Sequence, residues 1–208
     1  MICISIGNSD SFERINELKP EMVEIRYDLL DMKPQQVSTM LNRDIRQVAT
    51  CRPGKYSEAE RLDVLKNAIQ LGAAFVDVEI ESDHDFIASI VESAGKAGCA
   101  VIISYHNYSS TPERSKLEST INQCFKLGGN VAKIACAVIN ETDAATLLSL
   151  YGLPGRKVIL GMGEKGRITR VAALKLGAEF TFASFGEDDS TAPGQLTYEE
   201  FKQLQKII

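Results

Sequence analysis

The sequence predicts an α/β protein of the (β/α)8 TIM-barrel class, and three observations support that prediction. Short apolar stretches alternate with helix-forming stretches along the 208 residues, and the alternation gives eight strand-then-helix units. The apolar stretches are continuous, which is typical of a parallel sheet whose outer face is covered. Glycine ends four of the predicted helices just before the next strand, at Gly72, Gly98, Gly128 and Gly177. Eight such units most simply close into a barrel.

The predicted strands are short and rich in β-branched residues. They lie at Ile2–Ile6, Met22–Tyr27, Ile45–Cys51, Ala74–Ile80, Ala100–Tyr105, Val131–Val138, Lys157–Leu160 and Glu179–Ser184. The repeat of about 25–30 residues is the size of one βα unit, so we expect a single domain over residues 1–208. A doubly wound open sheet is the alternative architecture. A barrel predicts that the chemistry lies at the C-terminal ends of the strands.

Capping signals set the starts of the predicted helices. Ser57 and Thr197 are each followed three residues later by glutamate, which is a capping box, and Asp10 has the same pattern. Thr111 and Pro112 predict a cap residue followed by proline at the first helical position. The predicted helices begin at or near Asp10, Pro34, Ser57, Asp83, Thr111, Asn140, Arg167 and Thr197.

The composition is that of an ordinary globular chain, with 44% hydrophobic and 25% charged residues. The formal net charge is −5 and no basic run occurs, so we expect no nucleic-acid partner. No apolar stretch has the length of a membrane span and no signal peptide is recognisable, so we expect a cytoplasmic protein without membrane contact. The five cysteines are scattered without CxxC or metal-ligand spacing, which indicates reduced thiols and predicts no metal site.

One lysine lies inside an apolar strand: Lys133 is the single charged residue of Val131–Val138. Burial disfavours the ammonium form, so a desolvated lysine has a lowered pKa and is available as a neutral amine. A neutral amine attacks ketones and aldehydes to form an imine, or Schiff base. The structural alternative is a lysine near a strand end whose ammonium group reaches water.

Further polar residues lie on the predicted strands or just after them. Glu24, Arg26 and Asp28 alternate along one strand and its end, so they share a face and need pairing or a polar ligand. An internal Glu–Arg ion pair is the structural alternative. The other strands and the segments after them carry Arg52, Asp77, Glu79, His106, Lys133, Arg170, Thr191 and Gln195.

The chain has two histidines. His106 ends the predicted strand before that of Lys133, and the ordinary histidine pKa of about 6.5 suits proton transfer. A base beside a nucleophile is the expected arrangement for imine chemistry, whereas a purely structural histidine is the alternative. His84 lies near a predicted helix start, and we assign it no role.

Two loops are expected at the barrel mouth. Gly161–Arg167 is rich in glycine but matches neither GxxxxGK[ST] nor a dinucleotide fingerprint. We interpret it as a tight turn that brings Met162 and Arg170 to the mouth, although Met162 also fits a packing role. Phe185–Gln195 lacks apolar periodicity, and its second half is a candidate lid that closes on a ligand.

Taken together, these residues resemble the type I 3-dehydroquinate dehydratases over nearly the whole chain. The matching motifs are Glu24-x-Arg26-x-Asp28, Thr50-x-Arg52, Ser104-Tyr105-His106, Val131-Ala132-Lys133-Ile134-Ala135, Met162-Gly163 through Thr169-Arg170, and Thr191-Ala192-Pro193-Gly194-Gln195. The interval of 27 residues between His106 and Lys133 also fits the family. Each motif alone is unspecific, whereas their combination in this order is specific.

The resemblance implies a hydro-lyase that needs no cofactor and converts 3-dehydroquinate to 3-dehydroshikimate in the shikimate pathway of aromatic biosynthesis. It implies that Lys133 forms an imine with the substrate ketone and that His106 transfers protons. It also implies that Arg170 binds the substrate carboxylate, with Thr191 and Gln195 completing that part of the pocket. The residues implied to contact the ring hydroxyls or organise the site are Glu24, Arg26 and Arg52. Family members are commonly homodimers.

The chain departs from the family pattern at three places. Thr191 stands where serine is usual, and the hydroxyl is retained. Many relatives carry a glutamate four residues after the position of Arg52, where this chain has Tyr56, so the residue that orients His106 is open and Glu79 is a candidate. Relatives also often have residues ahead of the first strand that cover the barrel bottom, so we expect a less covered bottom here.

Two other functions use the same residues. An imine-forming aldolase on this fold would also need Lys133 and an acid–base group, but aldolases of sugar phosphates require a phosphate site after the last two strands. Glu164, Asp188 and Asp189 place negative charge in those loops, which disfavours a phosphate. A non-catalytic barrel that binds a carboxylate metabolite is the other alternative.

Overall fold

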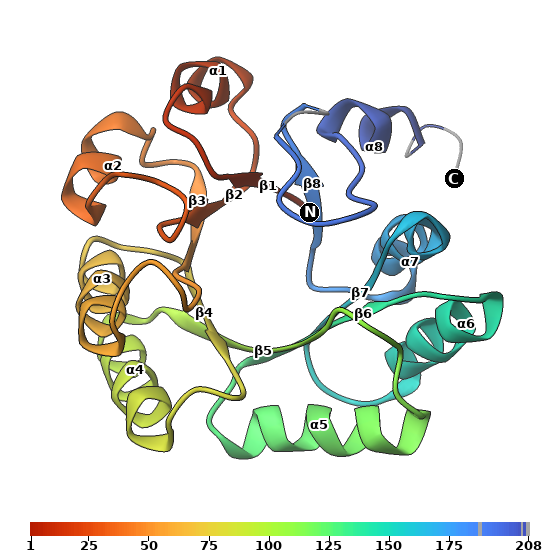
Figure 1. Ribbon diagram of the computed structural model, residues 1–208. Helices are drawn as coiled ribbons and strands as arrows, with labels where there is room; N and C mark the ends of the chain where they lie inside the picture. The colour runs from red at the N-terminus through yellow and green to blue at the C-terminus, as the bar shows by residue number, and fades with distance from the viewer. Residues whose placement is uncertain (187–188, 205, 207–208) are drawn as a thin grey trace.

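The computed structural model describes residues 1–186, 189–204 and 206, and eight parallel strands form its centre (Figure 1). The strands are β1 (Ile2–Ile6), β2 (Met22–Arg26), β3 (Arg46–Thr50), β4 (Phe75–Glu79), β5 (Ala100–Asn107), β6 (Val131–Ala137), β7 (Lys157–Met162) and β8 (Thr181–Ser184). Each predicted strand is present. The predicted (β/α)8 barrel is therefore confirmed, and the open-sheet alternative is wrong because β1 pairs with β8 as well as with β2.

The described residues form eight α-helices, which lie outside the ring of strands (Figure 1). They are α1 (Ser11–Leu18), α2 (Pro34–Met40), α3 (Glu58–Gln70), α4 (His84–Ala97), α5 (Arg114–Lys126), α6 (Glu141–Ser149), α7 (Arg167–Ala173) and α8 (Tyr198–Leu204), with short 3-10 turns at η1 (Leu150–Gly152), η2 (Glu164–Gly166) and η3 (Leu174–Leu176). The four glycines predicted to end helices all have positive φ, a conformation that glycine adopts without strain. No helix of the described residues is long and apolar enough to cross a membrane.

The cap predictions are correct for most helices and wrong for two. Ser57 and Asn140 form capping boxes with the third residue of their helices, and Thr197 exchanges bonds with Glu200. The helix predicted at Thr111 begins at Arg114, because the Thr111 hydroxyl donates to the carbonyl of Ala137 on β6 instead (2.7 Å).

The second exception is α1, where Asp10 makes no side-chain cap bond. The amide oxygen of Asn8 accepts from both the backbone N–H (3.1 Å) and the hydroxyl (2.9 Å) of Ser11 instead. The cap therefore comes from two residues earlier in the chain than the sequence pattern indicated.

The ring of strands has little backbone hydrogen bonding between β7 and β8. The hydrogen-bonded order is β7-β6-β5-β4-β3-β2-β1-β8, and the described residues form no ladder between β7 and β8. One backbone bond crosses this junction near the start of both strands, from the Glu179 N–H to the Lys157 carbonyl (2.9 Å). The wall is therefore continuous over seven of its eight strand junctions and looser at the β7–β8 junction.

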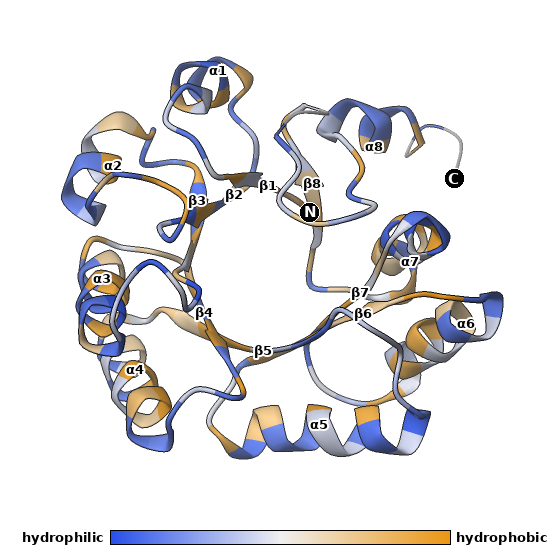
Figure 2. Ribbon diagram, viewed as in Figure 1, coloured by the Kyte–Doolittle hydropathy of each residue, from blue (hydrophilic) through white to orange (hydrophobic). Residues whose placement is uncertain are grey.

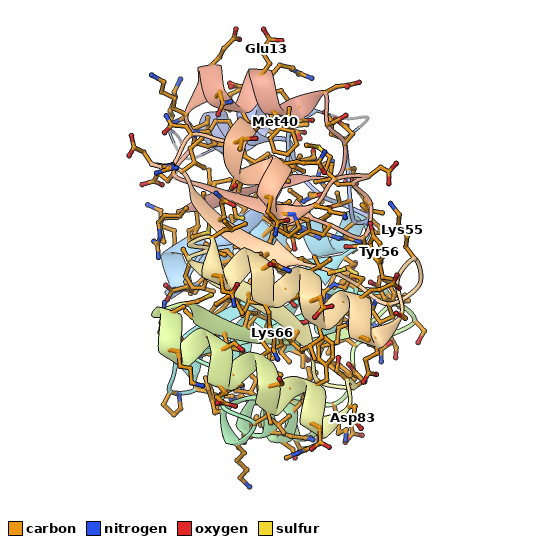
Figure 3. All side chains as sticks on the ribbon, turned by 90° about the vertical axis from the view of Figure 1, so that its left-hand side faces the viewer. Glu13, Met40, Lys55, Tyr56, Lys66 and Asp83 are labelled. Carbon is orange, nitrogen blue, oxygen red and sulfur yellow. The ribbon has the colours of Figure 1, made fainter. Side chains whose placement is uncertain are left out.

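The main core lies between the strands and the surrounding helices. In Figure 2 the faces of α4 and α5 that look toward the strands are largely hydrophobic, while their outer faces are mostly hydrophilic. Residues such as Ile87, Ile90, Leu117 and Ile121 on these faces are at most 2% exposed. The charged side chains of the molecule mostly project outward, as Figure 3 shows for Glu13, Lys55 and Lys66. This burial fixes the barrel by the hydrophobic effect and leaves its interior for function.

A second cluster fills the N-terminal end of the barrel interior, and we call it the apolar floor. Its members are Cys3, Met22, Val48, Phe75, Ile102, Val131, Val158 and Phe180, all with no exposed surface. The rings of Phe75 and Phe180 meet edge to face at 5.5 Å, and the guanidinium groups of Arg46 and Arg156 lie 5.1 and 5.8 Å from the Phe75 ring. The barrel bottom, which we expected to be less covered, is thus filled by side chains of the strands themselves.

Candidate active site

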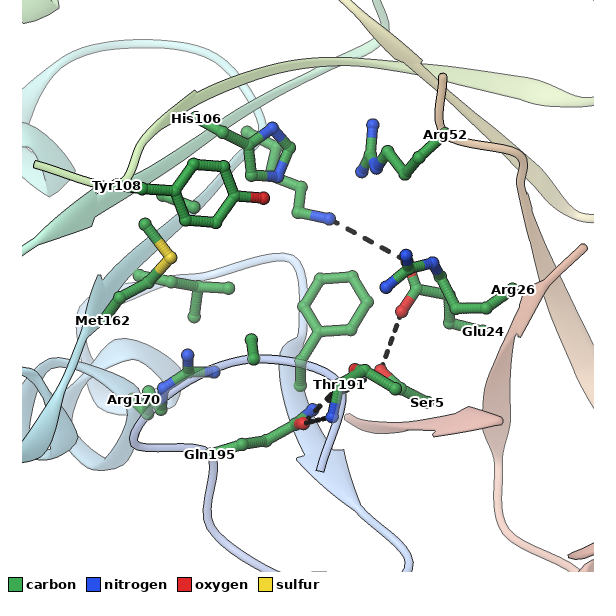
Figure 4. A pocket seen from close by; sticks show the side chains of 15 residues that line it. Ser5, Glu24, Arg26, Arg52, His106, Tyr108, Met162, Arg170, Thr191 and Gln195 are labelled. Carbon is green, nitrogen blue, oxygen red and sulfur yellow. Dashed lines mark hydrogen bonds and ion pairs between the residues drawn. The ribbon is translucent and has the colours of Figure 1, made fainter. Parts of the chain in front are cut away.

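A pocket opens at the C-terminal ends of the strands (Figure 4), and its space of about 590 Å³ includes the open mouth. Nine of the ten residues to which the sequence analysis gave a possible site role line it: Glu24, Arg26, Arg52, His106, Lys133, Met162, Arg170, Thr191 and Gln195. Glu79 is the exception. Along each strand, side chains two residues beyond the apolar floor face the same interior, so alternation places the charges directly above it.

Lys133 is buried on β6 and is 5% exposed. Its Nζ lies 2.8 Å from Oδ2 of Asp77 and 4.0 Å from Oε1 of Glu24, and it stands 4.2 Å from the centre of the Phe182 ring. The Lys133 nitrogen is therefore paired with a buried carboxylate, whereas the apolar strand pattern alone suggested an isolated amine. The ammonium group does not reach water at the surface, which excludes the structural alternative.

Asp77 on β4 receives three donors in a fully buried position. Ser104 Oγ donates to Oδ1 (2.6 Å), Arg52 Nη1 lies 3.0 Å from the same oxygen, and Lys133 Nζ donates to Oδ2 (2.8 Å). Burial by itself raises the pKa of this carboxyl, but the charges of Arg52 and Lys133 outweigh burial and hold the pKa of Asp77 well below its ordinary value. Asp77 is therefore a carboxylate at neutral pH.

Glu24 is the second buried carboxylate of the site. Its Oε2 accepts from the Ser5 hydroxyl (2.7 Å) and its Oε1 from the Thr50 hydroxyl (2.9 Å). Arg26, the next residue on the same face, forms a two-bond ion pair with Asp28 (3.0 and 2.5 Å). The internal Glu–Arg pair considered from the sequence is thus replaced by pairing of Arg26 with Asp28.

His106 lies near the end of β5, its imidazole is labelled in Figure 4, and it lines the same pocket as Lys133 of the neighbouring strand β6. Burial, together with the positive charges of Arg52 and Lys133, lowers the pKa of His106 well below the ordinary value, although Asp77 opposes this. The imidazole is therefore neutral at neutral pH. Its Nδ1 is buried and has no hydrogen-bond partner among the described residues.

An aromatic ring lies beside His106, and the described residues make no ion pair with its imidazole. The Tyr108 ring lies nearly parallel to it, with centroids 6.1 Å apart and planes 13° apart, and Figure 4 shows the phenol oxygen directed toward the middle of the pocket. Glu79 does not orient His106, because its oxygens lie 3.8 Å from Arg52 and from Arg61 instead. Tyr56, which stands where relatives have glutamate, packs against the outer core and is labelled in Figure 3.

Arg170 comes from α7 and is 1% exposed. Its backbone carbonyl accepts a hydrogen bond from Thr181 Oγ1 on β8 (3.3 Å), so α7 packs at the β7–β8 junction. At this junction the described residues of the two strands form no ladder of backbone hydrogen bonds. Within the described part of the chain the guanidinium has no carboxylate partner, and its Nε makes no hydrogen bond. Burial lowers the pKa of Arg170 to about 10, which leaves the group charged at neutral pH.

The candidate lid is described except for residues 187 and 188. The Gln195 amide oxygen accepts from the Thr191 N–H (2.9 Å) and hydroxyl (3.3 Å), and its nitrogen donates to Ser5 (3.4 Å). The lid contacts the loop after β7, where the Gly163 N–H donates to the Pro193 carbonyl (3.1 Å). Gly194 has a φ of +72°, and any side chain on it would clash with the backbone of Gly163. The contact therefore requires glycine at this position.

The acidic residues that argued against a phosphate site are partly neutralised. Glu164 lies 3.5 Å from Arg167, and Asp189 lies 4.0 Å from Arg14. Residue 188 lies outside the described residues. The described chain also holds no group of three or more His, Cys, Asp or Glu side chains placed to bind a metal ion.

Sequence reasoning missed the two residues in closest contact with the predicted pair. Asp77 was placed on the fourth predicted strand but was given no role, although a charged residue inside an apolar strand was a signal. Tyr108 lies two residues after His106, and its ring orientation could not be read from the chain. Ser5 and Ser104 complete the hydrogen bonds of the two carboxylates.

Comparison with known proteins identifies the family. A family model described as type I 3-dehydroquinase matches residues 2–208. A 3-dehydroquinate dehydratase of Methanococcus maripaludis (strain C5 / ATCC BAA-1333) is 31% identical over 220 residues, covering 100% of both chains. The crystal structure of the 3-dehydroquinate dehydratase from Aquifex aeolicus VF5 has 25% identity and a TM-score of 0.86, covering 100% of this chain and 98% of that chain.

A third similar protein carries a covalent ligand. The type I 3-dehydroquinate dehydratase from Clostridium difficile, solved with covalently modified comenic acid, has a TM-score of 0.86 at 24% identity and covers 99% of this chain and 90% of that chain. At this identity the likeness establishes the fold. Together with the family model over residues 2–208, these comparisons show that the chain belongs to the type I 3-dehydroquinase family.

Proposed function

We propose that this chain catalyses the dehydration of 3-dehydroquinate to 3-dehydroshikimate through an imine at Lys133, with His106 as the proton-transfer group. The observation that carries the proposal is one pocket in which the amine of Lys133, the neutral imidazole of His106 and the unpaired guanidinium of Arg170 all face the same space. A cyclic keto acid presents a ketone, an acidic proton next to it and a carboxylate, which are the three groups that such side chains bind or attack.

The reaction uses groups of the chain and the substrate alone. Lys133, as the amine, adds to the C3 ketone and water leaves, which gives a protonated imine. This imine withdraws electrons from the C2–H bond, and His106 takes the C2 proton. The electron pair then forms the C1–C2 double bond as the C1 hydroxyl leaves, protonated by His106. Water hydrolyses the imine and releases the unsaturated product and the lysine.

The remaining residues fit roles in substrate binding. Arg26 and Arg52 are held by carboxylates of the chain, whereas Arg170 has no carboxylate partner among the described residues, so Arg170 is the arginine available for the substrate carboxylate. Thr191 and Gln195 lie at the pocket rim, where their hydroxyl and amide reach the same ligand. Glu24 and Met162 also line the pocket, where they would contact the ring of the bound substrate. A homodimer remains a prediction from the resemblance, and sedimentation velocity measures it.

Borohydride reduction tests the imine directly. Wild-type protein incubated with 3-dehydroquinate and borohydride should gain the mass of one reduced adduct, and peptide mapping should place it on Lys133. Sugar phosphates, the substrates of imine-forming aldolases, should give no adduct. An adduct that forms only with sugar phosphates supports the aldolase, and tight binding of dehydroquinate without turnover or adduct supports a non-catalytic binding barrel.

Arg170→Lys is expected to raise KM by about 10–100-fold with a smaller effect on kcat. Lysine keeps the charge but lacks the planar pair of donors that matches a carboxylate. Arg167→Lys is the matched control, since Arg167 is on the same helix but pairs with Glu200 outside the pocket (2.8 Å). Steady-state kinetics of the two variants measure the difference, and an unchanged KM for Arg170→Lys would contradict the carboxylate role.

The pH at which kcat/KM falls on the acid side should lie below the ordinary pKa range of histidine. A group with a lowered pKa keeps its neutral form to lower pH, so His106 still accepts a proton where an exposed histidine, with a pKa of about 6.5, is already half protonated. Activity is then lost only as the pH falls through the lowered value. The pH dependence of kcat/KM reports this group in the free enzyme, and an acid limb centred at or above that ordinary value contradicts the assignment.

A further inference from the structure

We propose that Asp77 is the counter-ion of the imine nitrogen and keeps the imine at Lys133 protonated during the reaction. The inference rests on the proposed imine chemistry and adds a residue that neither the motifs nor the pocket lining identified. Asp77 is 1% exposed and does not line the pocket, whereas Lys133 does. Its contact with the reacting nitrogen therefore comes from behind, on the side away from the substrate.

The two oxygens of Asp77 have separate partners. Oδ1 accepts from Ser104 Oγ (2.6 Å) and faces Arg52 Nη1 (3.0 Å), while Oδ2 accepts from Lys133 Nζ (2.8 Å). The first oxygen fixes the carboxylate on β4, because β3 and β5 hold it from both sides. The second oxygen is thereby aimed at the lysine nitrogen, and Lys133 is its only described partner.

Other charges face Lys133 from the neighbouring strands, and they do not replace Asp77. The titratable groups around it are Cys3 on β1, Glu24 on β2, Arg52 after β3, Asp77 on β4, His106 on β5, and Arg26 on β2 further out. Glu24 is the one other acid near the nitrogen, at 4.0 Å, and both of its oxygens already accept hydroxyl donors. Asp77 is the carboxylate at hydrogen-bond distance.

The contact between Asp77 Oδ2 and Lys133 Nζ can act at two stages of the reaction. In the resting enzyme Asp77 holds the ammonium ion. For the attack, Lys133 loses one proton to the neutral imidazole of His106, and the amine adds to the ketone. The addition product then loses its oxygen as water, which carries away the proton held by His106 and a second proton from the nitrogen. The protonated imine nitrogen keeps one hydrogen and the positive charge, and it is joined to the substrate carbon by a double bond. The remaining N–H can keep the bond to Oδ2. A carboxylate there stabilises the protonated imine relative to the neutral imine, and only the protonated form withdraws the C2 electron pair effectively.

Asp77→Asn tests the proposal, because it keeps the shape and removes the charge. We expect kcat at neutral pH to fall about 10–100-fold with a smaller change in KM, since Asp77 does not line the pocket. The alkaline limb of the kcat profile should move to lower pH by about one unit or more, because the imine loses its proton more easily. Asp77→Glu, which restores the charge, should return the limb toward the wild-type position.

Ser104→Ala is the matched control. It removes a hydrogen bond from Asp77 Oδ1 and leaves the carboxylate charge in place, so the alkaline limb should stay where it is even if kcat falls slightly. A purely structural role for Asp77 would lower stability and activity in both variants without moving the limb in either. Circular dichroism melts accompany each profile.

The outcomes are distinguishable from failure of the proposed function. If the wild type forms no reducible adduct, the imine proposal fails; if it does and Asp77→Asn keeps the wild-type limb, the counter-ion proposal fails. Should Asp77→Asn not fold, wild-type protein decides: cyanoborohydride, which reduces protonated imines, should trap a constant fraction between about pH 7 and pH 9. A steep loss of trapping over that range overturns the proposal.

Discussion

Lys133→Ala is expected to reduce kcat by about 10⁴-fold or more and to abolish the borohydride adduct. The reason is geometric: Lys133 is the amine at the base of the pocket, and the next groups around it are carboxylates, an arginine and an imidazole, none of which forms an imine. Steady-state turnover and intact mass after reduction measure the two effects. Substantial residual turnover would refute the imine route.

Lys157 offers a matched control for this substitution. It is also a buried lysine on a barrel strand, but its ammonium group donates to the carbonyls of Leu153, Pro154 and Gly155 at the end of η1. Lys157→Ala removes that cap and should lower thermal stability while leaving the adduct on Lys133 intact. Loss of the adduct in both variants would show that trapping reports on folding and not on the nucleophile.

His106→Ala is expected to lower kcat by about 10²–10⁴-fold while a trapped adduct still forms. Solvent can exchange the protons for slow imine formation. The C2 proton of the bound substrate would lie inside the pocket, where His106 is the neutral base that shares the lining with Lys133. The adduct should therefore accumulate during turnover and be detectable by intact mass at early times.

His84→Ala is the control, because His84 opens α4 outside the pocket and should leave both kinetics and adduct unchanged. If His106→Ala turns over at the wild-type rate, another group moves the protons. If it forms no adduct at all, solvent does not replace His106 as the acceptor of the Lys133 proton, and His106 is indispensable for imine formation itself.

The barrel and most of the pocket could be predicted from local patterns. The alternation of apolar runs and capped helices sets eight βα units, and strand alternation then puts Glu24, Lys133 and His106 on the inner face. These features depend on spacing within one strand or one helix. The wrong helix start at Thr111 has the opposite origin, because its hydroxyl finds a partner on another strand, at the carbonyl of Ala137.

The details of the charged site depend on contacts across the ring, which the chain order does not reveal. Asp77 meets Arg52, Ser104 and Lys133, which lie 25, 27 and 56 positions away in the sequence. Strand alternation in the sequence can place such residues on one face of the sheet, but it does not show which carboxylate forms an ion pair with which lysine or arginine. For the same reason Glu79 was a reasonable candidate partner of His106, and only the fold shows that arginines occupy it.

The apolar floor has a consequence for the path of small molecules. Because Phe75, Phe180 and their neighbours fill the N-terminal end of the barrel interior, the pocket formed by the described residues opens at the opposite end, where the strands finish. In the proposed reaction the expelled water, the water that hydrolyses the imine and the product would therefore all pass Thr191 and Gln195 at that end. Substrate entry and product release would then share one route, which the candidate lid borders.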